Sequence, residues 1–72
     1  MASSLVAQIA EVQREIDMRR SVYPGLVARG RMRESEADLC ISRMRDVLAT
    51  LQWLARTERL IKQRLAEDGG EA

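Results

Sequence analysis

The chain has 72 residues, of which 46% are hydrophobic and 32% charged, and twelve Lys or Arg against eleven Asp or Glu leave a net charge of +1. A chain this short forms one domain and buries only about 60% of the surface of its unfolded form, so its core contributes about 3–5 kcal/mol. One Cys excludes an internal disulfide, and the lack of His argues against a zinc site. With disulfides and zinc set aside, a second subunit is the source of additional stability that we expect.

The first helix is expected over residues 4–22. Ser3 or Ser4 can cap it, because a serine hydroxyl accepts a hydrogen bond from a free N–H of the first turn. Hydrophobic residues then recur at spacings of three and four, which places them on one helical face. They are Leu5, Ile9, Val12 and Ile16. The helix should end near Val22 or Tyr23, since the residue before Pro24 is pushed out of helical geometry.

Residues 23–34 are expected to form a short helical corner, in which Pro24 starts a turn and Gly30 ends it. The segment from Arg19 to Arg33 contains five arginines and no acid: Arg19, Arg20, Arg29, Arg31 and Arg33. They form a candidate basic patch for phosphate, nucleic acid or an acidic protein surface. The favoured interpretation is a solvated corner whose arginines meet the helix dipole, because only Tyr23 adds an aromatic ring and acids follow at once.

A second helix is expected over residues 36–66, and residues 67–72 are expected to be a disordered tail. The segment from Ser35 to Asp38 has the form of a capping box, with acids suited to the positive end of a helix dipole. Hydrophobic residues follow a seven-residue pattern, positions a to g, with Leu51 at position a. The stripe consists of Ala37, Cys40, Met44, Val47, Leu51, Leu54, Ile61 and Leu65, with Glu58 on the same seam.

The unequal lengths of the two expected helices predict association. At 1.5 Å per residue they span roughly 30 Å and 48 Å, so the first covers the second only to about residue 55. The fold class is therefore all-α: a helical hairpin with a short helical corner, pairing into a dimeric helix bundle. Parallel and antiparallel pairing both remain open. Glu58 on the seam needs either a solvent-exposed edge or an arginine, from Arg14, Arg19 or the second copy. The expected dimer interface is Leu51, Leu54, Ile61 and Leu65.

A second apolar patch lies on the back of the same helix. Trp53 and Leu60 share heptad position c with Leu39, roughly 160–200° from the main seam, and Arg56 lies beside them. An exposed Trp flanked by Leu and Arg is typical of a protein-binding hot spot. Two interpretations remain open: a site for a different protein formed by Trp53, Arg56 and Leu60, or packing of Trp53 against the second subunit or the N-terminal segment.

Nothing in the sequence indicates catalysis or a cofactor. Cys40 lies on the core stripe without a neighbouring base, and neither Gly25 nor Gly30 is followed by the Lys-Ser or Lys-Thr of a phosphate-binding loop. The N-terminus lacks a signal-peptide pattern, and no apolar run approaches the ~20 residues of a membrane span. A non-enzymatic protein of the reducing cytoplasm is expected.

Four short motifs lie in the middle of the chain: Val22-Tyr23-Pro24, Gly30-Arg31-Met32, Glu36-Ala37-Asp38 and Leu48-Ala49-Thr50-Leu51. Over residues 14–54 this pattern resembles a group of small proteins encoded by phages and prophages of Gram-negative bacteria. It implies expression inside an infected or lysogenic bacterium, and it supplies no catalytic or binding residue. Gly25 departs from the larger or basic residue expected after the proline, which argues against a ligand contact there.

Together these features predict a small, dimeric accessory protein that acts by binding a host protein, with inhibition of that protein as one mode of action. Two alternatives are a nucleic-acid-associated regulator that uses the arginine-rich corner, and a structural piece of a phage particle.

Overall fold

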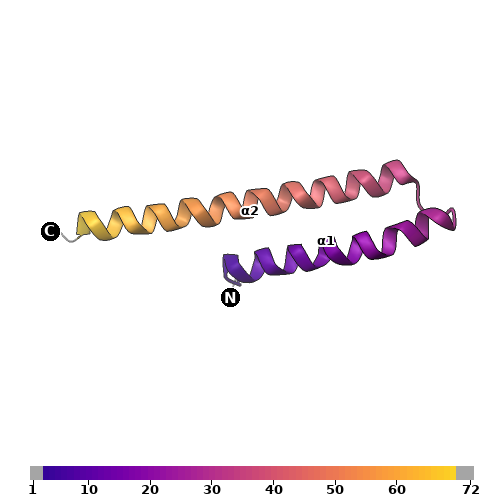
Figure 1. Cartoon of the computed structure of the whole chain (residues 1–72). Helices are drawn as coiled ribbons and strands as arrows, with labels where there is room; N and C mark the ends of the chain where they lie inside the picture. The colour runs from indigo at the N-terminus through magenta and orange to yellow at the C-terminus, as the bar shows by residue number, and fades with distance from the viewer. Residues whose placement is uncertain (1–2, 70–72) are drawn as a thin grey trace.

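A computed structural model describes residues 3–69 of the chain, and the side chains of residues 3–67, as a hairpin of two helices (Figure 1). Helix α1 spans Leu5–Ala28 and helix α2 spans Glu34–Gly69. Residues 3–69 contain no strand, so the all-α hairpin predicted from the sequence is confirmed. The two helices lie side by side in a rod that measures 64 × 21 × 17 Å.

Helix α1 begins at the serine cap that the sequence predicts. Ser4 has an extended backbone, and its hydroxyl accepts a hydrogen bond of 3.1 Å from the backbone N–H of Ala7. Farther along the helix, Ile16 has only 2% of its surface exposed. Leu5, Ile9 and Val12, which share its face, are half-buried. The hydrophobic spacing therefore identifies the side of α1 that packs on α2.

Pro24 does not end α1, so the expected helix over residues 4–22 is too short. The helix continues through the proline to Ala28. A proline inside a helix loses one hydrogen bond and crowds the carbonyl four residues earlier, at a cost of about 3 kcal/mol. The turn beyond Pro24 buries hydrophobic surface that offsets this cost, because Leu26 and Val27 are half-buried and Val27 lines the same groove as Ala37 of α2. Tertiary packing thus overrides the local preference.

The corner is the short segment 29–33, not the helical segment 23–34 that the sequence predicts. Gly30 has a φ of +71°, the left-handed conformation that ends many helices. Its N–H donates to the carbonyl of Val27 at 3.0 Å, and the N–H of Arg31 donates to Leu26 at 2.9 Å. This pair of bonds is a Schellman motif, which satisfies carbonyls at the end of α1. Gly30 therefore ends helix α1 itself, and not a separate helical turn of the corner.

Helix α2 begins earlier and ends later than the expected residues 36–66. It starts at Glu34, and the N–H of Ala37 donates to the carbonyl of Arg33 at 3.0 Å. Ser35 therefore lies inside the first turn and does not cap it. The segment 67–69, expected in the disordered tail, is helical. Nothing breaks the helix before the first glycine of the tail. Residues 70–72 lie outside the described part of the chain.

The hairpin alone has almost no interior. Among the described residues only Ile16 and Ala37 are fully buried. The accessible surface is 5926 Å², whereas a compact monomer of this mass exposes about 4,500 Å². The radius of gyration is 18.1 Å, compared with about 11 Å for a compact domain of this length. Much of the hydrophobic surface of this rod is therefore available to another molecule.

Candidate protein-binding surface

The N-terminal end of α1 reaches only the middle of α2. Ser3, Ala7 and Val12 line a groove together with Val47 and Leu51 of α2. Beyond that point a shallow hollow is lined by α2 residues alone: Thr57, Leu60, Ile61, Gln63, Arg64 and Glu67. Figure 1 shows α2 continuing well past the start of α1. We call residues 56–69 the overhang.

The hydrophobic side chains of the overhang are open to solvent. The exposed fraction is 63% for Leu60, 54% for Ile61 and 64% for Leu65. Of the other two residues expected at a dimer interface, Leu54 is 41% exposed and Leu51 is half-buried in the groove beside α1. The chain itself therefore leaves most of the expected interface uncovered.

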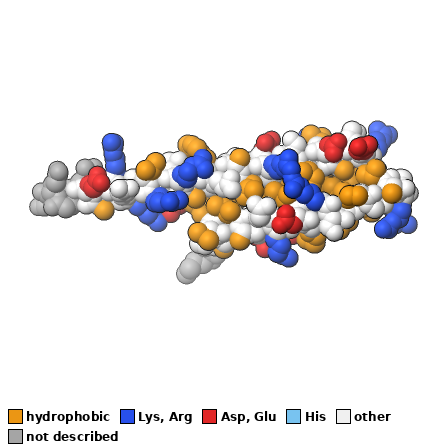
Figure 2. Space-filling view, in the orientation of Figure 1, with side chains coloured by type: hydrophobic (Ala, Val, Ile, Leu, Met, Phe, Trp, Pro, Cys, Tyr) orange, Lys and Arg blue, Asp and Glu red, His pale blue; other side chains and the backbone are white. Residues whose placement is uncertain are grey.

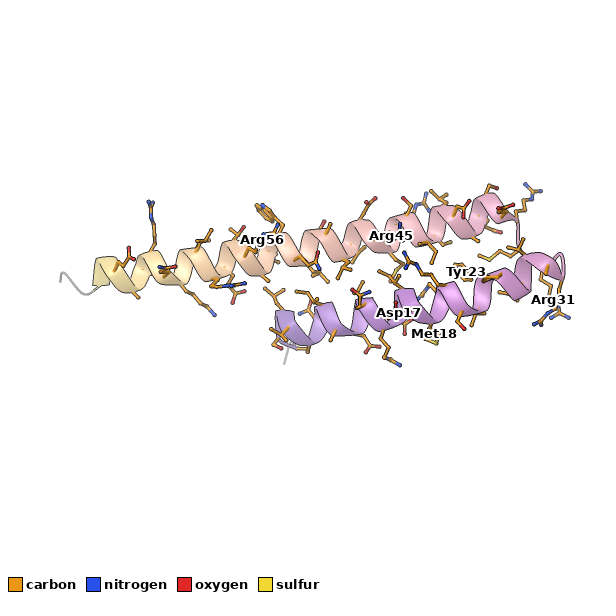
Figure 3. All side chains as sticks on the ribbon, viewed as in Figure 1. Asp17, Met18, Tyr23, Arg31, Arg45 and Arg56 are labelled. Carbon is orange, nitrogen blue, oxygen red and sulfur yellow. The ribbon has the colours of Figure 1, made fainter. Side chains whose placement is uncertain are left out.

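Trp53, Arg56 and Leu60 form a second exposed patch, which we call the Trp53 patch. Trp53 is 57% exposed and Arg56 is also exposed. At 100° per residue Trp53 and Leu60 point within about 20° of each other, on the side of α2 turned away from α1. Figure 3 places Arg56 on α2 near the N-terminal end of α1. The structure therefore brings the three residues onto one helical face, as the sequence predicts.

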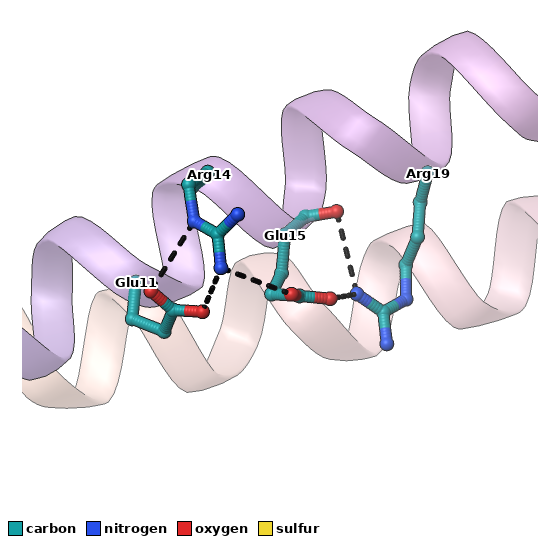
Figure 4. Close-up of polar contacts among 4 residues, drawn as sticks. All are labelled: Glu11, Arg14, Glu15 and Arg19. Carbon is teal, nitrogen blue, oxygen red and sulfur yellow. Dashed lines mark hydrogen bonds and ion pairs between the residues drawn. The ribbon is translucent and has the colours of Figure 1, made fainter.

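The five arginines of the candidate basic patch do not all point the same way. Arg19 donates to the Glu15 carboxylate at 2.5 Å, and this bond raises the pKa of its guanidinium (Figure 4). Arg20 lines a groove between the helices. The remaining three, Arg29, Arg31 and Arg33, are exposed around the corner, and Figure 3 shows Arg31 at its tip. One arginine of the set is thus already held by a carboxylate.

The same ion network continues toward the start of α1. Arg14 bonds Glu11 and lies 3.8 Å from Glu15 (Figure 4). Its hydrogen bond holds the pKa of the Glu11 carboxyl below its ordinary value. Glu58, expected to need an arginine or a solvent-exposed edge, pairs with Lys62 at 2.8 Å, and its side chain is 45% exposed. Each of these close ion pairs joins residues three or four positions apart on the same helix, which are neighbours on the helix surface.

A groove near the corner is a feature that the sequence reasoning missed. It has a volume of about 830 Å³ between the two helices, and Figure 2 shows hydrophobic side chains gathered along this seam. Its apolar lining includes Tyr23, Pro24, Val27, Ala37 and Ile41. Its charged lining is Arg20, Glu34, Asp38, Arg45 and Asp46. The groove exists because α1 continues past Pro24, which the local sequence does not signal.

Other kinds of site find no support in the described residues. Over residues 3–67 no three His, Cys, Asp or Glu side chains gather in a way that could hold a metal ion. Cys40 is a free thiol and half-buried. Neither α1 nor α2, as far as Gly69, contains a stretch apolar enough to cross a membrane.

Comparisons with known proteins leave the chain without an assigned family. No family model matches the sequence, and searches of curated proteins and of solved structures return no match.

Proposed function

We propose that this chain is a non-catalytic accessory protein that binds a host protein through the Trp53 patch and blocks its action. The observation that carries the proposal is the 57% exposure of Trp53 beside Leu60, itself 63% exposed. Tryptophan and arginine are the residues most enriched at binding hot spots, where a single truncation commonly costs 2 kcal/mol or more, about 30-fold in affinity. Resemblance to small phage proteins supplies the host-directed part of the proposal.

The geometry favours this function over nucleic-acid binding by the corner. Arg19 is paired with Glu15, and Arg20 shares its groove with the carboxylates of Glu34 and Asp38. Phosphate binding needs uncompensated positive charge, because affinity comes from neutralising phosphates. The Trp53 patch, by contrast, contains no acid and has an apolar centre with a guanidinium at its edge.

The test is an affinity capture from a lysate of a Gram-negative bacterium, with three forms of the tagged protein: wild type, Trp53→Ala and Gln52→Ala. Gln52 is the matched control, because it is exposed and adjacent but lies outside the patch. We expect one protein to be retained by the wild type and by Gln52→Ala and lost with Trp53→Ala, while circular dichroism and particle mass stay unchanged.

Two results would count against the proposal. Capture of the same proteins by Trp53→Ala as by the wild type removes the patch from recognition. Loss of helicity or of self-association in Trp53→Ala assigns the side chain to the fold instead.

A further inference from the structure

One long face of α2 remains uncovered by α1. The half-buried residues Met44, Leu48 and Leu51 occupy heptad positions a and e, the side on which α1 packs. Position d points to the neighbouring side, where Val47 is 46%, Leu54 41% and Ile61 54% exposed. This d stripe begins where α1 is present and continues into the overhang. From Val47 to Ile61 the stripe spans fourteen residues, about 21 Å, so one helix that lies along α2 can cover it.

The exposed area matches what a second copy of the chain would bury. Each hairpin exposes 5926 Å², roughly 1,400 Å² more than the about 4,500 Å² of a compact monomer of its mass. Two copies together therefore have about 2,800 Å² in excess, within the range of 2,000–5,000 Å² that obligate homodimers bury. A short peptide would cover only part of this area.

Position g, at the edge of the d stripe, selects the direction of pairing. Its residues are Glu36, Arg43, Thr50, Thr57 and Arg64. In an antiparallel pair with its two-fold axis at Thr50, Glu36 lies opposite Arg64 of the second copy, and Arg43 lies opposite Thr57. In a parallel, in-register pair every residue meets its own copy, so Glu36 faces Glu36 and Arg64 faces Arg64. Charge complementarity therefore favours the antiparallel arrangement.

The same asymmetry extends along the whole of α2. Residues 34–46 carry four acids and two arginines, whereas residues 56–67 carry four basic side chains and two acids. Antiparallel pairing brings the acidic third against the basic third and also opposes the helix dipoles. Thr50 suits the two-fold position, because its hydroxyl donates to the Asp46 carbonyl of its own helix at 3.0 Å and so leaves no unpaired polar group there.

We infer that a second copy of this chain docks antiparallel on the d stripe, with Thr50 at the two-fold axis and the overhang of each copy lying on the first third of its partner's α2. The pairing produces a four-helix bundle. Trp53 lies three residues from Thr50 and about 60° around α2 from it, so the Trp53 patch flanks this interface. The inference goes beyond the proposed function, and its tests leave Trp53 unchanged.

Cysteine cross-linking tests the direction of pairing in the full chain with Cys40→Ser as background. Thr50→Cys should form a cross-linked dimer across the two-fold axis. Glu36→Cys alone and Arg64→Cys alone should not, since each lies about 42 Å from its own copy in the antiparallel dimer. Mixing the two variants should give a cross-linked heterodimer.

The opposite results are equally clear. A dimer cross-linked by Glu36→Cys alone means parallel pairing. A mass of 8.2 kDa at every concentration, with no cross-link from any variant, means that no dimer forms. Because Trp53 is untouched in all these variants, neither outcome bears on host-protein binding.

A charge exchange tests the register. Arg64→Glu should weaken the dimer by about tenfold, because two symmetric attractive pairs become repulsive. Glu36→Arg combined with Arg64→Glu should restore the affinity to within about threefold of the wild type. Arg59→Glu is the matched control, since it makes the same charge change on an exposed site of α2 away from the d stripe. Equal weakening by Arg59→Glu, or no restoration in the double variant, would overturn the register. Sedimentation equilibrium measures all four dissociation constants.

Discussion

Gly25 and Gly30 lie five residues apart and have opposite backbone requirements. Gly30 has a φ of +71°, which an L-residue with a side chain adopts only at a cost, whereas Gly25 lies within α1. A Cβ built on Gly25 would lie 3.2 Å from an Arg29 guanidinium nitrogen, the end of a flexible side chain that can move. Nothing lies within 4 Å of a Cβ built on Gly30, so conformation alone decides the effect there.

Alanine at these two positions should therefore change stability in opposite directions. Gly30→Ala is expected to lower the free energy of unfolding by about 1–2 kcal/mol, because it forces a side chain into the left-handed region. Gly25→Ala is expected to raise it by about 0.5–1 kcal/mol, because alanine loses less conformational freedom in a helix. Urea unfolding at one fixed protein concentration measures both. A stabilising Gly30→Ala would mean that this residue can leave the left-handed conformation without loss.

At the scale of the element, local sequence patterns predicted what depends on periodicity and missed what depends on packing. The serine cap and the stripe from Leu5 to Ile16 were correct, because helical spacing and a hydroxyl at the start are sufficient signals. The predicted end of α1 was wrong, because the restriction on the residue before a proline is only a local preference of the backbone. Partial burial of Val27 against α2 depends on residues ten or more positions away, such as Ala37 and Ile41.

The contact between the helices depends on Ile16, the most deeply buried large side chain described. Ile16→Ala is expected to lower the free energy of unfolding by about 2–4 kcal/mol, a large share of what so small a core supplies. Val6→Ala is the control on the same helix, since Val6 is 77% exposed, and it should change stability by no more than about 0.5 kcal/mol. Thermal unfolding followed by circular dichroism compares them. Equal effects would mean that α1 does not pack on α2 through this face.

For the whole molecule, the sequence predicted the exposed surfaces better than the concave ones. The unequal helix lengths predicted the overhang, and the heptad positions predicted that Trp53 and Leu60 share a face. Both predictions follow from residue counts along a regular helix. The corner groove could not be predicted, since its two walls meet only when α1 extends past Pro24. The different orientations of the five arginines could not be predicted either, because they depend on which arginine pairs with a carboxylate, as Arg19 does with Glu15.

The antiparallel dimer should be a thicker rod and not a longer one. Small-angle scattering is expected to give about twice the chain mass of 8.2 kDa, with a maximum dimension close to the 64 Å of one hairpin. In the proposed pairing the two α2 helices would overlap over nearly their whole length around Thr50, so the dimer would gain width and not length. A particle of the same mass but clearly greater length would indicate that only the overhangs touch.

The scarcity of buried side chains has a consequence for the cell. Because Ile16 and Ala37 are the only buried side chains among the described residues, folding of the proposed dimer would be coupled to association and would depend on the concentration of the chain. At low concentration most chains would be unfolded and open to proteolysis. At high concentration most would be folded dimers able to act. The dose of the gene product, more than any ligand or modification, would set when the protein acts.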